Sequence, residues 1–205
     1  SRYYMEDGGA FVIENYNQTR AQSSFFPGIA GLFGIPLWVF YVNRGQCIAS
    51  FGIRSKDEAI MEYLPANKAY QLTPSQGFRT FIKVKNGTKN IFYEPFSPSQ
   101  SAGLTEITNK MSIRAYDLML HEINRALGLE VTVSYFTIPD APFAGLARTL
   151  TIKNISRAVK HIEFLDGISV LDPNGVNNWF LKEMSRTIEA WMTVTYADKG
   201  IPVYK

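Results

Sequence analysis

The 205-residue sequence has few of the side chains that form disulfides and metal sites. It contains one cysteine, Cys47, and two histidines, His121 and His161. One cysteine forms no internal disulfide, and these three residues show no metal-ligand spacing. Cys47 lies in an alternating apolar stretch, so a buried thiol is favoured over a nucleophile. We expect structural roles for both histidines, which have no visible partner in the sequence.

Charge is also sparse, and long apolar runs are missing. Charged residues make up 19% of the chain, and a net charge of +3 is too small to indicate nucleic-acid binding. The longest apolar run, 35–42, contains Pro36 and is far shorter than the roughly 18 residues of a membrane-spanning helix. The N-terminus lacks the order of a secretory signal peptide. We therefore expect a soluble, cytoplasmic protein without nucleic-acid or membrane partners.

The common catalytic motifs are absent as well. The sequence has no GxxxxGK[ST] loop, no GxGxxG after a strand, no GxSxG and no HExxH. Carboxylates cluster at Asp57, Glu58 and Glu62, and again at Glu163 and Asp166. A glycosidase needs two carboxylates held across the scissile bond, but spacing in the sequence does not establish that arrangement. A polar edge or turn is the favoured interpretation of both clusters.

What the sequence does contain is aromatic residues, 14% of the chain, and apolar residues that alternate with a period of two. This pattern predicts half-buried strands. We expect strands at 129–135, 146–152 and from 162 to a turn at 166–167, a hairpin of 78–84 with 91–96 around Asn86-Gly87, and a central strand at 37–42. One substantial helix is expected near Trp179–Met192, with Asn178 as its N-cap, while 54–77 is ambiguous. The predicted fold class is all-β, an antiparallel sandwich with one short helix.

Long ordered segments of the chain resemble the start of cellobiose-phosphorylase-like enzymes, glycoside hydrolase family ninety-four. The closest likeness is to 1,2-β-oligoglucan phosphorylases, and it covers nearly the whole chain. The segments are Ser23–Trp38, Phe40–Gln46, Ser50–Glu62, Pro65–Gln71, Gly77–Lys83, Leu165–Ser169, Leu181–Met184 and Ala190–Met192.

The resemblance implies an inverting glycoside phosphorylase. Such enzymes split a β-glucosidic bond with inorganic phosphate as co-substrate and release α-glucose 1-phosphate, with no further cofactor. Their N-terminal β-supersandwich, similar in fold to galactose mutarotase, precedes a linker and an (α/α)6 barrel that carries the general acid and most of the phosphate site. Residues 1–205 would then be the N-terminal sandwich of a larger enzyme, incomplete at its C-terminus. We expect this chain to hold no catalytic residue and to be inactive alone.

In these homodimeric enzymes the sandwich of one subunit approaches the active site of the other. The best candidate for contact with a β-glucan oligosaccharide is the segment Asp172–Trp179, which carries Asn174, Asn177, Asn178 and Trp179. Amides can donate to and accept from sugar hydroxyls, and an indole face can stack on a sugar ring. The alternative is that Asn174-Gly175 is a turn, Asn178 a cap and Trp179 a core residue.

Two arginines are further candidates. Arg148 falls on the same strand face as Leu146 and Leu150, so its permanent charge requires either an ion pair or a bound ligand. We favour the ion pair and keep a sugar-binding role as the alternative. Arg44 lies in a predicted hairpin connection, where a turn is favoured over an anion site.

Two other functions remain open. A free-standing carbohydrate-binding module would use the aromatic residues. A mutarotase-like epimerase would need a convergent histidine and carboxylate pair.

Overall fold

The computed structural model describes residues 2–26, 34–101, 106–173, 175–184, 187–191, 193–197 and 201–204. Asn174, one of the predicted sugar-binding residues, and Met192 lie outside these residues. The described chain is mainly antiparallel β-sheet, as the sequence predicted. None of the helices in this part of the chain has the length and apolar character needed to cross a membrane.

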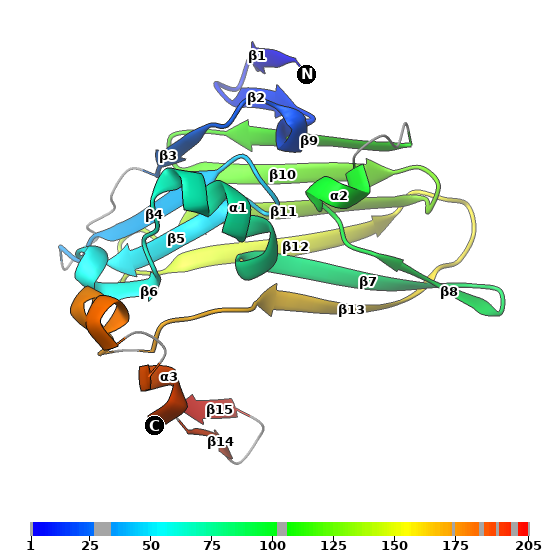
Figure 1. Ribbon diagram of the computed structural model, residues 1–205. Coiled ribbons are helices and arrows are strands. Elements are labelled where there is room, and N and C mark those ends of the chain that lie inside the picture. Colours follow the sequence, from blue (N-terminus) through cyan, green and yellow to red (C-terminus); the bar gives the residue numbers. More distant parts are fainter. Residues whose placement is uncertain are drawn as a thin grey trace.

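Two layers of sheet form the sandwich (Figure 1). One layer is a six-stranded sheet, whose strands in spatial order are β1 (Tyr3–Met5), β2 (Phe11–Glu14), β9 (Ile107–Ile113), β10 (Asp117–Asn124), β11 (Leu129–Thr137) and β12 (Leu146–Asn154). Every pairing in it is antiparallel. The alternation in β11 is the clearest, because Leu129, Val131, Val133 and Tyr135 are all buried.

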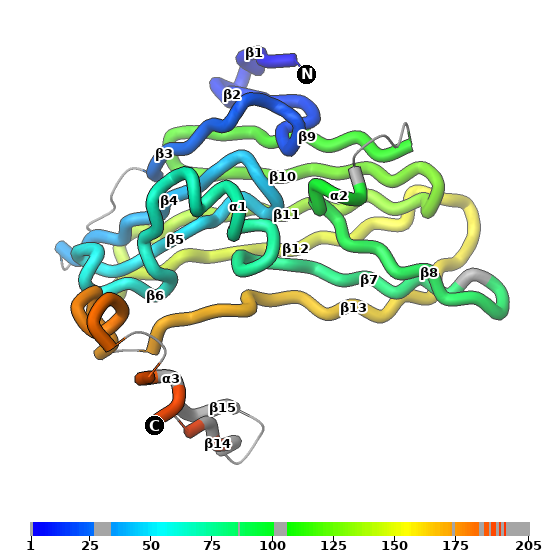
Figure 2. Tube along the Cα trace, viewed as in Figure 1, coloured from blue at the N-terminus to red at the C-terminus, as the bar shows by residue number. Residues whose placement is uncertain are grey.

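Two smaller sheets form the facing layer. A four-stranded sheet has the order β3 (Ser23–Phe25), β4 (Leu37–Val42), β5 (Ile48–Ile53) and β6 (Ala59–Met61). A three-stranded sheet has the order β13 (His161–Ile168), β7 (Phe78–Asn86) and β8 (Lys89–Tyr93). The trace in Figure 2 follows the chain from β12 in one layer to β13 in the other. Side chains from all three sheets form one hydrophobic core.

Helices are short and peripheral. The longest, α1 (Ala66–Gln76), covers the outer face of the four-stranded sheet, where Ala69 packs with Phe40 and Val42 (Figure 1). The others are η1 (Tyr16–Gln18), η2 (Lys56–Glu58), α2 (Pro98–Ser101), the π-helical η3 (Phe180–Met184) and α3 (Thr187–Trp191). A separate hairpin pairs β14 (Val194–Ala197) with β15 (Ile201–Tyr204).

The expectation of one substantial helix was incomplete. Helices η3 and α3 lie within the predicted stretch Trp179–Met192, but α1, the longest helix among the described residues, lies in the stretch that was ambiguous. Helix α1 gives a weak sequence signal because it buries only the small side chains Ala69 and Thr73 and contains Pro74. Trp179 and Trp191, at the two ends of the predicted stretch, are both exposed.

Two predicted turns also need correction. The hairpin of β7 and β8 is confirmed, but Asn86 pairs with Lys89, so the turn residues are Gly87 and Thr88. Gly87 has φ +61°, which suits a turn with glycine first. No turn occurs at 166–167, because β13 continues to Ile168. The central strand β4 is confirmed, although Trp38 is partly exposed.

Candidate functional site

The segment predicted to contact sugar leaves the sandwich beside β6. The Asp172 N–H donates a hydrogen bond to the Ile60 carbonyl at 2.8 Å, which ties the segment to that strand. The Val176 N–H donates to the Pro173 carbonyl at 3.1 Å, and Gly175 adopts φ +94°. A backbone angle in this range favours glycine. The chain therefore bends sharply before it presents Asn177, Asn178 and Trp179.

Asn177 is the residue that caps the helical turn. Its Oδ1 accepts a hydrogen bond from the Phe180 N–H at 3.1 Å, and its carbonyl accepts from the Leu181 N–H at 3.1 Å. These two bonds define an N-cap, whose side chain satisfies an orphan donor of the first turn. The predicted cap at Asn178 is thus one residue too late.

Asn178 instead bridges two helical turns. With its side-chain oxygen turned toward the neighbouring ammonium groups, that oxygen accepts from Lys56 Nζ and Lys182 Nζ, each at 3.3 Å. Lys56 belongs to η2 and Lys182 to η3, so residues distant in the sequence meet at this amide. An ammonium group has three donors, and Lys56 also donates to Asp57 Oδ1 at 3.0 Å, so its bonds to Asn178 and Asp57 leave one donor for a ligand. Sequence analysis gave neither lysine a role in this site, because their proximity depends on the tertiary fold.

Trp179 is not a core residue. Its side chain is 58% exposed, and its ring lies roughly perpendicular to the neighbouring Phe180 ring, with centroids 5.2 Å apart and planes at 76°. An exposed indole beside amides and ammonium groups combines an apolar face with hydrogen-bonding groups. Asn177, Asn178 and Trp179 therefore form, with Lys56 and Lys182, the candidate site.

Arg148 does not belong to this group of residues. It lies on β12 and pairs with Asp166 on β13 through both guanidinium Nη atoms, one of them at 2.8 Å. Its Nη2 also donates to Gln46 Oε1 at 2.6 Å and to Thr80 Oγ1 at 3.2 Å. Its Nε donates to the Tyr135 hydroxyl at 3.3 Å.

The Arg148 guanidinium is therefore already satisfied by protein groups. Burial lowers the pKa of Arg148, but the bonds to Asp166 and the nearby Tyr135 outweigh that effect and hold it above the usual range. The guanidinium also lies over the Phe78 ring, 5.1 Å from the centroid. Of the two roles left open by the sequence, the structure contains the ion pair. A sugar could reach Arg148 only by displacing these partners.

The other charged candidates are also paired. Arg44 donates to the carbonyls of Tyr16, Asn43 and Thr19, as expected of a residue that holds a turn. The carboxylate clusters do not converge: Asp57 pairs with Lys56, Glu58 with Arg54 and Glu163 with Lys83.

The histidines lie on different sheets. A structural role was expected for His121, and its Nε2 lies 3.1 Å from Glu130 Oε1 across the β10–β11 ladder. That hydrogen bond, with Lys153 nearby, lowers the pKa of Glu130. His161 is exposed at the start of β13.

Sequence analysis missed one buried carboxylate. Glu122 points from β10 into the core, 1% exposed, where it accepts from Tyr93 Oη at 2.5 Å, the Phe96 N–H at 3.1 Å and Asn109 Nδ2 at 3.3 Å. Burial raises the pKa of Glu122, and these three donors only partly offset that effect. Its alternation with Leu118 and Leu120 was the signal that could have identified it as an inward residue.

Within the described ranges, no three His, Cys, Asp or Glu side chains are arranged to hold a metal ion. No family model matches the chain, and no curated protein is significantly similar to it.

Proposed function

We propose that this chain is the N-terminal, non-catalytic domain of a glycoside phosphorylase that cleaves β-glucosides of the β-1,2-glucan or cellobiose type. The parent enzyme would use inorganic phosphate and release α-glucose 1-phosphate. Its general acid and phosphate ligands would lie in an (α/α)6 barrel of the same chain or of a neighbouring subunit. The present domain would supply dimer contacts and part of the rim of the sugar site.

The observation that carries this proposal is the exposure of Trp179 beside two amides and two ammonium groups. An indole face packs against the C–H face of a pyranose, while amide and ammonium groups bond its hydroxyls. Asn178 and its two lysines are already in mutual contact, so little ordering is needed when a sugar arrives. A rim that only orients the substrate fits this arrangement, because the carboxylate in contact with it, Asp57, is held in an ion pair with Lys56.

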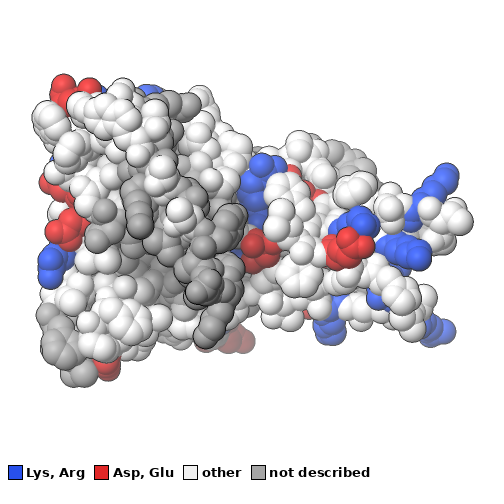
Figure 3. Space-filling model, turned by 90° about the horizontal axis from the view of Figure 1, so that it is seen from below, with Lys and Arg blue, Asp and Glu red and all other residues white. Residues whose placement is uncertain are grey.

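A second observation supports contact with another domain or subunit. The outer face of the three-stranded sheet exposes Phe92 (75%), Leu165 (72%) and Phe81 (40%). Leu165 pairs directly with Phe81 across the β13–β7 ladder. Seen from below, charged side chains are scattered among uncharged ones on this side of the molecule (Figure 3). Exposed apolar side chains gathered on one sheet face are typical of interaction surfaces.

A free-standing carbohydrate-binding module is the second candidate, and the same exposed Trp179 favours it. The two candidates differ in what the isolated domain can do. A binding module holds an oligosaccharide by itself, whereas a rim residue completes a site that another domain builds. A mutarotase-like epimerase has less support. The histidine and carboxylate that lie together are His121 and Glu130, and Glu130 is already in an ion pair with Lys153.

The test titrates the 205-residue chain with sophorose and longer 1,2-β-gluco-oligosaccharides while recording the indole N–H resonances by NMR. Weak perturbation of the Trp179 resonance supports the rim assignment, and tight saturable binding supports the free-standing module. Trp38 is the internal control, because its Nε1 donates to the Arg54 carbonyl at 3.0 Å and reports an intact fold. An unperturbed Trp179 resonance at every concentration would contradict both candidates. Release of glucose 1-phosphate by the purified chain would contradict the non-catalytic role.

A further inference from the structure

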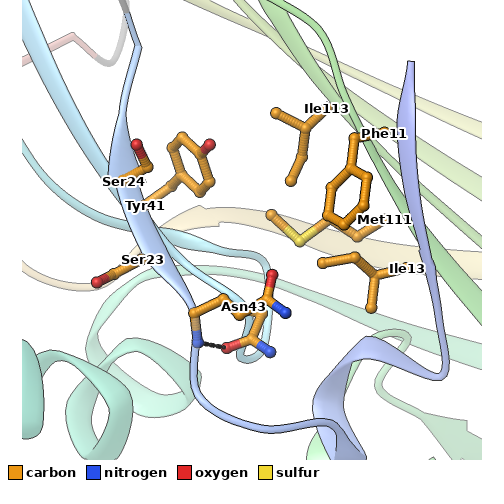
Figure 4. A pocket seen from close by; sticks show the side chains of 9 residues that line it. Phe11, Ile13, Ser23, Ser24, Tyr41, Asn43, Met111 and Ile113 are labelled. Carbon is orange, nitrogen blue, oxygen red and sulfur yellow. Dashed lines mark hydrogen bonds between the residues drawn. The ribbon is translucent and has the colours of Figure 1, made fainter. Parts of the chain in front are cut away.

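A separate pocket of about 220 Å³ opens between the two layers of the sandwich (Figure 4). Strands β2 and β9 of the six-stranded sheet form one side. Strands β3 and β4 of the four-stranded sheet, with the residues just before β3, form the other. None of its lining residues belongs to the candidate sugar rim.

The side formed by the six-stranded sheet is apolar. Phe11 and Ile13 from β2, with Met111 and Ile113 from β9, point into the space between the layers (Figure 4). Ile13 and Met111 are completely buried or nearly so and form the floor. The Phe11 ring stacks on Tyr3 with centroids 6.3 Å apart, which fixes its position as a wall.

The opposite side offers a small number of polar groups. Ser24 pairs with Tyr41 across the β3–β4 ladder, so both side chains face the same side of the sheet. The Tyr41 hydroxyl points into the space between the layers (Figure 4). Serine fills little volume at a position where a larger apolar side chain would close the gap. β3 therefore contributes a small polar residue to the pocket wall, beside Tyr41.

The wall next to these residues is held in place before any ligand binds. Asn43 Nδ2 donates to Thr19 Oγ1 at 2.7 Å and to the Arg20 carbonyl at 2.9 Å, while its Oδ1 accepts from the Gln22 N–H at 2.8 Å. Asn43 is fully buried and uses its amide on these bonds. It thus shapes the pocket but offers nothing to a ligand, and a preformed wall lowers the ordering cost of binding.

We propose that this pocket binds a single-ring aromatic alcohol of the phenol type. An apolar cavity of about 150 Å³ is sufficient for benzene, so the pocket has room for one substituted ring. The ring would pack between Phe11 and the polarizable Met111 sulfur, and its one hydroxyl would meet the Tyr41 and Ser24 hydroxyls. A pyranose fits less well, because several hydroxyls would face Ile13 and Ile113 without partners. This site does not depend on the proposed phosphorolytic role.

The test follows methionine methyl resonances of the 205-residue chain by ¹³C NMR during titration with phenol, with Met111→Leu used to assign the Met111 signal. Phenol should shift the Met111 signal saturably. Met119 on β10 is the control, because it alternates with the buried Leu118 and Leu120 and faces outward. Toluene should bind more weakly than phenol, and glucose should cause no shift. An unmoved Met111 signal with phenol, or equal responses to phenol and glucose, would overturn the proposal.

Substitutions at two serines, one in the pocket and one outside it, test the location. Ser24→Leu should fill the pocket and weaken phenol binding about tenfold or more, because the leucine side chain would occupy the space that the phenol ring needs. Ser134→Leu makes the same change on β11, where Ser134 alternates with the buried Val133 and Tyr135 and does not line the pocket, so it should leave phenol binding unchanged. Ser24 is exposed on an edge strand, and thermal melting will verify that both variants fold. Equal phenol affinity in the two variants would contradict the location.

Discussion

Asp166 accepts hydrogen bonds from both Nη atoms of Arg148 and so joins the edge strands of two different sheets. Arg148 lies on β12 of the six-stranded sheet and Asp166 on β13 of the three-stranded sheet. Gln46, which precedes β5 of the third sheet, accepts from the same guanidinium at 2.6 Å. One ion pair therefore lies where all three sheets of the sandwich meet.

We predict that Asp166→Ala lowers the free energy of unfolding by about 2 kcal/mol, because it leaves a largely buried guanidinium without its counter-charge. Only 9% of the Arg148 side chain is exposed. Glu163→Ala is the matched control: it removes another carboxylate of β13, which pairs with Lys83 on β7, but the Glu163 side chain is 74% exposed. That control should cost less than about 1 kcal/mol. Urea denaturation measures both, and equal losses would show that burial does not strengthen the Arg148 pair.

The sequence predicted the strands better than it predicted this ion pair. The alternation of β11 is visible locally, because each inward residue from Leu129 to Tyr135 is apolar. Asp166-Gly167 matches a turn in local propensity, yet Asp166 stays in β13 with Thr80 opposite it and Arg148 as its charge partner. Contacts with residues distant in the sequence override the local turn propensity, and the spacing of residues in the sequence does not predict them.

In the candidate site too, the sequence did not determine which residue plays which role. Amides before an apolar helical turn indicate a cap, but two adjacent asparagines leave the capping residue open by one position. Asn177 takes that role, which releases Asn178 to meet Lys56 and Lys182. Lys56 comes from a turn more than a hundred residues earlier, so only the tertiary structure could bring it into the site.

We predict that the buried carboxyl of Glu122 makes stability decrease with rising pH. Because burial raises its pKa in the folded state, the folded chain binds more protons than the unfolded chain above the usual carboxyl pKa of 4.5. The contribution of Glu122 to the free energy of unfolding is therefore fully present below that pH, and it is lost as pH rises through the pKa of Glu122 in the folded state. Glu122→Gln removes the titration and keeps the shape, since an amide can accept from the Phe96 N–H and donate to Tyr93 Oη.

Guanidinium denaturation from pH 4 to pH 8 gives the measurement, as the difference between the Glu122→Gln and unmodified chains at each pH. That difference should move in favour of the glutamine variant as pH rises. Taking the difference cancels the titration of carboxyls common to both chains. A constant difference across the range would mean that Glu122 has an ordinary pKa in the folded state.

We predict that Cys47 does not react with thiol reagents in the native chain. The residue is fully buried, and burial raises the pKa of its thiol, so the nucleophilic thiolate is scarce. Its Sγ lies 3.9 Å from Met111 Sδ in the core. Dithionitrobenzoate at pH 8 should label Cys47 only after denaturant is added. Rapid labelling without denaturant would show that the core opens far more often than its packing indicates.

The last prediction separates the cap from the sugar contact in an active phosphorylase that carries this domain. Asn177→Ala removes the bond from the Phe180 N–H and should lower stability by roughly 1 kcal/mol. Asn178→Ala leaves that cap intact but removes the acceptor shared by Lys56 and Lys182, so it should raise the KM for oligosaccharide with little change in melting temperature. Trp179→Ala should raise the KM as well, because the exposed indole stabilises the domain little but offers its face to a sugar.

Steady-state phosphorolysis and thermal melting, measured on the same three preparations, distinguish the roles. If Asn178→Ala and Trp179→Ala leave kcat/KM unchanged, the segment is only a capped turn and the rim assignment is wrong. If kcat/KM falls, each variant is then mixed with a subunit whose barrel is inactive but whose segment is intact. Recovery of activity in the mixed dimer would mean that the segment serves the neighbouring active site. Without recovery, it serves the active site of its own chain, because only a contact across the dimer interface can be supplied by the inactive subunit.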